Sequence, residues 1–156
     1  MNEIKKIASF AVDHDLITEG VYVSRKDGDI TTYDMRTRKP NAGAYMDNLT
    51  MHSFEHMFAT LVRSSEIGSQ VIYFGPMGCQ TGFYLLVRNA DNARVLSVIK
   101  KTLEDIVKYD GKMVGGTRPE CGNYKNLDLY AAKLEAKLYL AKLDAGKNSF
   151  DYPKGE

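Results

Sequence analysis

The sequence has few of the residues that hold metals or form disulfides: two cysteines and three histidines in 156 residues. Its formal net charge is only +1 and no basic stripe is visible, which argues against nucleic acid as a partner. No apolar run approaches the roughly 20 residues that cross a bilayer, and the polar N-terminus has no apolar segment of the signal-peptide kind. We therefore expect a cytoplasmic protein with no membrane partner, whose cysteines are thiols or ligands rather than a disulfide.

The rest of the composition is that of an ordinary globular protein, with 44% hydrophobic and 26% charged residues. A chain of this length can bury a sizeable core without disulfides or metals as staples. No internal repeat and no low-complexity segment is visible. We expect one domain over residues 1–156.

The pattern of apolar residues predicts an α+β fold, with a mostly antiparallel sheet packed by helices. Asp27 and Gly28 lie between two β-rich runs and indicate a hairpin. Strands are expected over residues 21–25, 30–36, 71–74 and 83–87, and helices over residues 48–64, 93–109 and 126–145. Gly146 is expected to end the last helix, with a loosely ordered tail after it. The charged residues of that helix, Glu135 among them, are expected to face solvent.

One short motif points to chemistry. His52, Glu55 and His56 form the pattern H-x-x-E-H within the helix expected over residues 48–64. Histidines four residues apart project from one face of a helix, and two neutral imidazoles at that spacing can bind one divalent metal. Glu55 is close enough to act on a molecule that the metal holds. The alternative is a chance pair of histidines packed on a helix, with Glu55 in solvent.

Cys121 lies in a glycine-rich loop that also contains Gly115, Gly116 and Pro119. It is either a free thiol packed on the core or a thiolate that completes a His₂Cys set. Catalytic zinc sites commonly have three protein ligands and one open position. Gly122, directly after the thiol, would let the backbone approach a metal.

Cys79 lies in a second glycine-rich stretch, between two expected strands. This turn lacks the Gly-Lys-Ser/Thr ending of a nucleotide-binding P-loop, and no helix is expected after it. The thiol is either a small structural residue or a reactive group near the metal, where a cation would favour the thiolate. His14 and Arg36, taken alone, are most simply solvated residues.

Taken together, these motifs resemble those of the S-ribosylhomocysteine lyases, bacterial enzymes that make the precursor of the autoinducer-2 signal. Five blocks occur in the family's order. They are Ser9-Phe10 with Asp13-His14, Tyr33-Asp34-Met35-Arg36, His52-Ser53-Phe54-Glu55-His56, Pro76-Met77-Gly78-Cys79-Gln80-Thr81-Gly82-Phe83-Tyr84, and Cys121-Gly122.

The resemblance implies that His52, His56 and Cys121 hold one divalent metal ion per subunit, Fe²⁺ in the native state, with Zn²⁺ or Co²⁺ able to substitute. It also implies that Glu55 and Cys79 are the general acid/base residues. The reaction would convert S-ribosylhomocysteine to homocysteine and 4,5-dihydroxy-2,3-pentanedione by metal-assisted carbonyl migration and β-elimination. Such a lyase serves quorum sensing, through autoinducer synthesis, or the methyl cycle.

The resemblance further implies that Ser9, His14 and Arg36 line the substrate pocket of a homodimer, with pockets built from both chains. Two positions depart from the family's pattern. Tyr73 stands where many members have an acidic residue near the substrate, and Gln80 stands where many have arginine. These departures affect substrate contacts rather than the metal or the acid/base pair.

Two other functions are compatible with the H-x-x-E-H motif. In a metallopeptidase, Glu55 would activate a metal-bound water, and the reactive Cys79 would have no task. In a non-catalytic metalloprotein the metal would be a structural staple. Structural zinc sites are closed and four-coordinate, so Cys79 would then be a fourth ligand.

Overall fold

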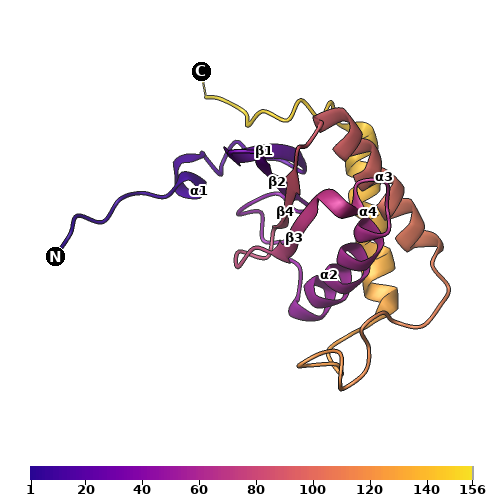
Figure 1. Cartoon of the computed structure of the whole chain (residues 1–156). Helices are drawn as coiled ribbons and strands as arrows, with labels where there is room; N and C mark the ends of the chain where they lie inside the picture. Colours follow the sequence, from indigo (N-terminus) through magenta and orange to yellow (C-terminus); the bar gives the residue numbers. More distant parts are fainter. Residues whose placement is uncertain (156) are drawn as a thin grey trace.

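The computed structural model describes residues 1–155, and in it an antiparallel sheet packs on a layer of helices (Figure 1). The strands are β1 (Gly20–Asp27), β2 (Ile30–Arg36), β3 (Val71–Pro76) and β4 (Gly82–Arg88), in the order β1-β2-β4-β3. The helices are α1 (Ala8–Ala11), α2 (Asn48–Arg63), α3 (Asn92–Lys108) and α4 (Leu129–Ala145), with a 3₁₀ turn η1 (Gly68–Gln70) before β3. The α+β prediction is confirmed, as are the hairpin and the three long helices.

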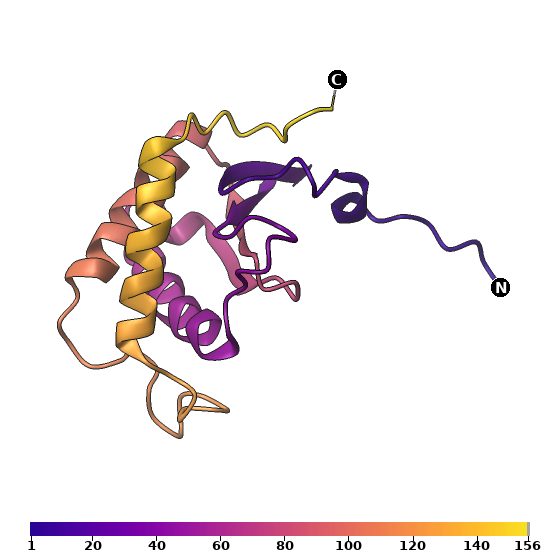
Figure 2. The same cartoon turned by 180° about the vertical axis from the view of Figure 1, so that it is seen from behind.

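The first residues of the chain form an arm that leaves the sheet. The arm contains α1, which the sequence did not predict, and Figures 1 and 2 show it extending away from the helical layer. Ile4 and Phe10 on this arm are 90% and 66% exposed. Among residues 1–155, no helix combines the length and the apolar character that crossing a bilayer requires.

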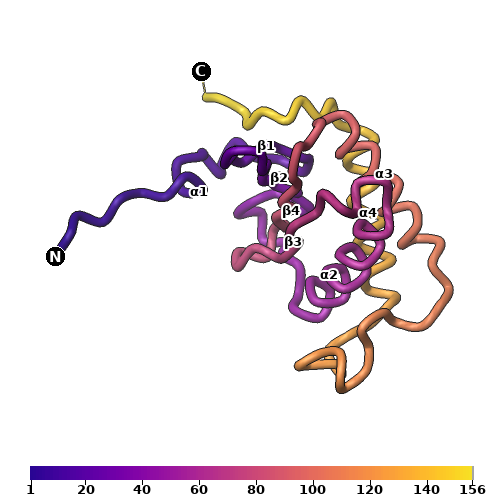
Figure 3. Tube along the Cα trace, in the orientation of Figure 1, coloured from indigo at the N-terminus to yellow at the C-terminus, as the bar shows by residue number. Residues whose placement is uncertain are grey.

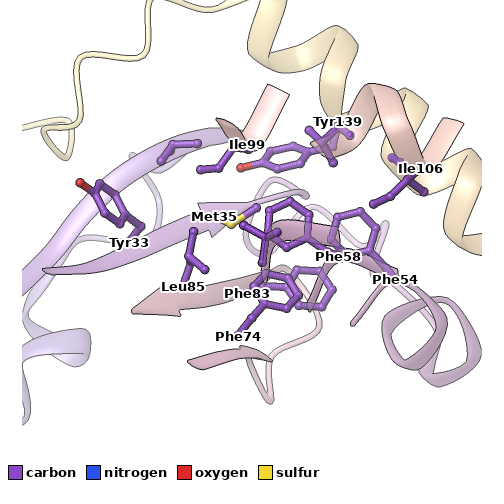
Figure 4. Close-up of a cluster of buried hydrophobic side chains, with 14 of the residues drawn as sticks. Tyr33, Met35, Phe54, Phe58, Phe74, Phe83, Leu85, Ile99, Ile106 and Tyr139 are labelled. Carbon is purple, nitrogen blue, oxygen red and sulfur yellow. The ribbon is translucent and has the colours of Figure 1, made fainter. Parts of the chain in front are cut away.

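Aromatic side chains fix α2 against the sheet. Phe54 and Phe58 of α2 are fully buried, and Figure 4 shows them beside Phe74 of β3 and Phe83 of β4. The ring centroids of Phe58 and Phe74 are 4.5 Å apart, and those of Phe54 and Phe83 are 4.9 Å apart. Contacts of this kind add to the free energy gained by burying the rings, so they strongly favour one orientation of the helix.

That orientation also decides where the two histidines point. His52 and His56 precede Phe54 and Phe58 by two residues, which is a rotation of about 200° around the helix axis. Because the phenylalanines face the sheet, the imidazoles face the opposite side, where the chain between α3 and α4 passes.

The last helix begins three residues later than the sequence predicts. The structure starts α4 at Leu129, and Asp128 is its N-cap, accepting a hydrogen bond from the backbone N–H of Tyr130 at 2.9 Å. The helix ends at Gly146 as expected. Residue 126 lies outside the helix, and its carbonyl oxygen is 2.8 Å from Nδ1 of His52, as described below.

The expectation that Glu135 faces solvent is wrong. Glu135 is only 2% exposed, and Arg38 donates two hydrogen bonds to its carboxylate, at 2.6 and 3.0 Å. These hydrogen bonds raise the pKa of Arg38. The pair joins α4 to the segment after β2, across 97 positions of sequence.

The expectation of a loosely ordered tail is also wrong. The backbone carbonyl oxygen of Phe150 accepts a hydrogen bond from the backbone N–H of Val23 at 2.8 Å. Phe150 also forms an isolated parallel β-bridge with Tyr22. The ring of Tyr152 stacks on that of Tyr22, with centroids 5.0 Å apart. Figure 3 shows the tail running over β1 after α4 ends.

Glu135→Ala is expected to lower the free energy of unfolding by about 2 kcal/mol, because it removes two charge-assisted hydrogen bonds from a buried position. Urea denaturation measures the change. Glu104→Ala, an exposed position on α3, is the matched control and is expected to leave stability close to the parent's. Equal effects of the two substitutions would show that the ion pair does not stabilise α4.

Candidate metal centre

The two histidines of the motif lie on α2 as predicted. Their ring centroids are 4.6 Å apart and the ring planes are perpendicular. Both residues are partly buried, so a ligand can reach them from solvent. One turn of helix separates them, which leaves both imidazoles on the same side of α2.

The loop between α3 and α4 brings Cys121 to this histidine pair. Its Sγ lies 3.4 Å from Nε2 of His52, across 69 positions of sequence. One ligand atom from each of His52, His56 and Cys121 lies within 4.8 Å of the other two. Three donors at these separations can surround one ion.

Backbone carbonyl groups of the same loop orient both imidazoles. His52 Nδ1 is 2.8 Å from the carbonyl oxygen of Asn126, and His56 Nδ1 is 3.0 Å from that of Val114. A carbonyl oxygen only accepts, so each Nδ1 must carry the proton and donate. The lone pair of each neutral imidazole is then on Nε2, and metal-binding histidines are commonly held in this way.

The donor set fits a divalent transition metal. Two neutral imidazole nitrogens and one thiolate sulfur suit zinc, iron and cobalt, and hold them in sites that keep a position open. In the part of the chain that the structure describes, His52, His56 and Cys121 are the only such group of three. Cys79 is not a member of it.

Gly115 permits the close approach of the loop to α2. Its φ of +63° lies in the left-handed region, and a Cβ atom there would be 2.8 Å from Nδ1 of His56. This is the nitrogen that donates to the carbonyl group of Val114. Sequence reasoning singled out the loop for its glycines, but the requirement at residue 115 depends on the distant histidine.

Glu55 lies beside the histidines, in a surface pocket of about 260 Å³. The pocket is lined by Asn48, Met51, His52, Glu55, Pro76, Asn123 and Asn126. A carboxylate and one imidazole of the candidate metal centre therefore line the same pocket, where a polar ligand could contact both. Pro76, which also lines the pocket, is the last residue of β3.

Cys79 lies three residues after Pro76, on the turn between β3 and β4, and is an exposed free thiol. Its Sγ is 2.9 Å from Oγ1 of Thr81 and 3.9 Å from Nη1 of Arg36. The turn therefore presents a sulfur atom with a cation behind it.

The expectation that Arg36, considered by itself, is a solvated residue is wrong. It is 2% exposed, and its guanidinium forms a salt bridge with Asp34 at 2.6 Å. Burial lowers the pKa of Arg36, but the charge and hydrogen bonds of Asp34 outweigh this and leave the pKa raised. The guanidinium also donates to Oγ1 of Thr81 at 2.8 Å.

Ser9 and His14 lie away from the histidine pair within this chain. Ser9 lines a different pocket, which Ser24, Thr32 and Tyr84 also line. The Nδ1 atom of His14 donates to the carbonyl oxygen of Val12 at 2.9 Å. The structure thus brings together four of the eight predicted site residues, His52, Glu55, His56 and Cys121. Arg36 contacts Cys79 on the turn between β3 and β4, and Ser9 and His14 are in the N-terminal segment.

The two positions that depart from the family's pattern are both accessible. Tyr73 of β3 is 53% exposed. Gln80 is partly buried and has a φ of +64°, a conformation that few residues other than glycine adopt. It is held there by its carbonyl oxygen, which accepts from the backbone N–H of Met46 at 3.1 Å.

The fold is α+β, and two helical imidazoles and a loop thiol form a group that could hold a metal ion, next to a pocket that a carboxylate lines. The sequence model of the S-ribosylhomocysteinase (LuxS) family matches residues 7–149. The chain belongs to this family.

Named relatives agree with this assignment. The S-ribosylhomocysteine lyase of Borrelia garinii is 40% identical over 157 aligned residues, which cover 96% of this chain and all of the relative. The S-ribosylhomocysteine lyase of Finegoldia magna is 39% identical, and that of Clostridium acetobutylicum is 37% identical. In both cases the alignment covers 97% of this chain and all of the relative.

Gly115→Ala is expected to weaken metal binding by about 10- to 100-fold, because the new Cβ displaces the loop that orients His56. Competition with a chelator, followed by metal analysis, measures the affinity. Gly78→Ala, on the turn between β3 and β4, is the matched control, since a Cβ there meets no other atom within 4 Å. Parental affinity in the Gly115→Ala protein would contradict the role given to the loop.

Proposed function

We propose that this chain, as one domain over residues 1–156, is a metal-dependent lyase that cleaves S-ribosylhomocysteine to homocysteine and 4,5-dihydroxy-2,3-pentanedione. Membership of the LuxS family supports the reaction, and the names of the relatives support the substrate. The single observation that carries the proposal is the convergence of His52, His56 and Cys121 in a chain with this relationship.

The chemistry of the substrate explains why such a site is needed. The sulfur of homocysteine is attached to C5 of the ribose, and this carbon is not next to the aldehyde. Direct loss of the sulfur is slow because nothing stabilises the carbanion that would form on the neighbouring carbon, C4. Moving the carbonyl group along the sugar to C3 makes the proton on C4 acidic, and β-elimination then releases homocysteine. Each step needs a group that takes or returns a proton at a defined atom.

In this proposal His52, His56 and Cys121 hold the ion, and we propose Fe²⁺ as the native metal, with Zn²⁺ or Co²⁺ as substitutes. When bound, the ion supplies Lewis acidity to the oxygens of the sugar. The Nδ1–carbonyl hydrogen bonds of the two histidines keep their Nε2 lone pairs available, which supports this assignment.

Glu55 and Cys79 are the proposed acid/base residues. Glu55 shares a pocket with His52, so its carboxylate can exchange protons with a sugar held there. Cys79, with Arg36 beside it, can act as a thiolate base and return the proton as a thiol. Groups positioned in this way typically accelerate a reaction by about 10²- to 10⁴-fold each.

The active unit is proposed to be a homodimer, in which Ser9 and His14 complete the pocket of the partner subunit together with the partner's Arg36. Two features support this. The arm that carries Ser9 and His14 leaves its own sheet (Figure 2). Ile7 and Phe10 on the arm are 55% and 66% exposed, as expected for residues that a second chain would cover.

The proposed setting is the cytoplasm. Both cysteines are free thiols, and the reaction requires each to stay reduced, one as a ligand and one as an acid/base. There the reaction would remove a by-product of the methyl cycle and supply the precursor of autoinducer-2 for quorum sensing.

The two alternatives explain fewer of the contacts. A metallopeptidase leaves the thiol of Cys79 and its buried arginine partner without a task. A structural metal site would use Cys79 as a fourth ligand, but the Sγ of Cys79 contacts Thr81 and Arg36 instead. Parallel incubation with S-ribosylhomocysteine and with casein tests the proposal. We expect free thiol, detected with Ellman reagent, from the first and no proteolysis of the second.

Cys79→Ala is expected to lower the turnover number by about 10²- to 10⁴-fold while leaving metal content and fold unchanged. Glu55→Gln is expected to behave similarly. Ellman detection of homocysteine and metal analysis of the same samples measure the two quantities. Release of homocysteine by the Cys79→Ala protein at the parental rate would refute its acid/base role.

A heterodimer with one His14→Ala subunit and one Cys79→Ala subunit tests whether the pockets combine both chains. The two forms can be coexpressed with different tags and purified on both. If His14 serves the partner's Cys79, one site carries both defects and the other carries none, so about half of the parental turnover is expected. Turnover as low as that of the two variant homodimers would place His14 and Cys79 in the same subunit's site.

A further inference from the structure

The charge behind Cys79 belongs to a buried ion pair. The side chains of Asp34 and Arg36 are 1% and 3% exposed, and Arg36 donates to the two carboxylate oxygens at 2.6 and 3.1 Å. The same guanidinium contacts Thr81 and the Sγ of Cys79. Its position therefore depends on how firmly Asp34 is held.

Tyr152, in the tail after α4, holds Asp34 from the other side. Its hydroxyl is 2.7 Å from Oδ2 of Asp34, the oxygen that also accepts from Nη2 of Arg36. Burial, and next the charge of Asp34, raise the pKa of Tyr152 well above its ordinary value. The phenol therefore keeps its proton and donates a hydrogen bond to the carboxylate of Asp34.

The tail is attached to β1 close to the position at which the Tyr152 hydroxyl contacts Asp34. Phe150 is tied to β1 by its hydrogen bond from Val23, and the ring of Tyr152 stacks on that of Tyr22. The hydroxyl of Tyr22 has a different partner, the carbonyl oxygen of Thr18 at 2.8 Å. Of the two stacked phenols, Tyr152 is the one that contacts the ion pair.

We propose that Tyr152 is a positioning residue for Cys79: its hydroxyl holds Asp34, Asp34 holds Arg36, and Arg36 sets the charge beside the thiol. The proposal rests on the acid/base role of Cys79 given above. It extends the active site to the C-terminal tail, far from Cys79 in the sequence.

The direction of the effect follows from the charges around the sulfur. Arg36 from β2 and Tyr84 from β4 both interact electrostatically with Cys79, and Asp34 and Tyr152 interact in turn with Arg36. Without the phenol hydrogen, more of the negative charge of Asp34 is felt at Cys79, and Arg36 is held less firmly. Both changes disfavour the thiolate.

Tyr152→Phe tests this, because it keeps the stacked ring and removes only the hydroxyl. The measurement is the rate of alkylation of Cys79 by iodoacetamide as a function of pH, in the metal-loaded protein without substrate. Peptide mass spectrometry quantifies the alkylation of Cys79 separately from that of Cys121. We expect the midpoint of the profile to rise by about half a unit to one unit, which slows alkylation about three- to tenfold on its acidic side.

Tyr22→Phe is the matched control, since it removes the other hydroxyl of the same stack and is expected to leave the profile unchanged. Superimposable profiles of the parent and Tyr152→Phe would overturn the proposal, and so would an equal shift in Tyr22→Phe. Undiminished turnover of the Cys79→Ala protein would instead refute the proposed acid/base role, and it would leave the alkylation result intact.

Discussion

Two hydrogen bonds between imidazole Nδ1 atoms and backbone carbonyl groups organise the candidate metal centre. They attach the loop between α3 and α4 to α2, and they fix the tautomer of His52 and His56. The same attachment carries Cys121 to the histidine pair. Each such bond contributes about 0.5–1.5 kcal/mol net, so a bound ion would add greatly to the order of the loop. Metal binding and loop structure are therefore expected to be coupled.

Most of the fold follows from local patterns. The helix α2 runs over Asn48–Arg63, within one residue of its expected end, because its buried residues repeat at helical spacing. The loop could not be derived in this way. Its path depends on Gly115 and on two carbonyl groups that contact side chains 74 and 58 positions earlier, and no local pattern encodes such contacts. For the same reason the start of α4 was predicted three residues early.

The errors share one physical cause, which is pairing of charged or polar groups over long sequence distances. Glu135 has the local pattern of a solvated helical residue, but Arg38 neutralises it in a buried position. Arg36 is buried beside Asp34, only two residues away, and its long-range contacts are those of the guanidinium with Thr81 and Cys79. The tail is polar and has no apolar periodicity, yet the hydroxyl of Tyr152 donates a hydrogen bond to the carboxylate of Asp34. A charge whose partner is far away in the sequence reads as exposed until the fold is known.

The proposed metal centre consists of two imidazoles and one particular thiol that surround a single divalent ion. Titration of the metal-free protein with Co²⁺, followed by near-ultraviolet absorption, tests it most directly, because thiolate ligation produces a charge-transfer band. We expect the parent and Cys79→Ser to bind one equivalent of Co²⁺ and to show the band, and Cys121→Ser to lose the band. A band that persists in Cys121→Ser, or that disappears in Cys79→Ser, would contradict this ligand assignment.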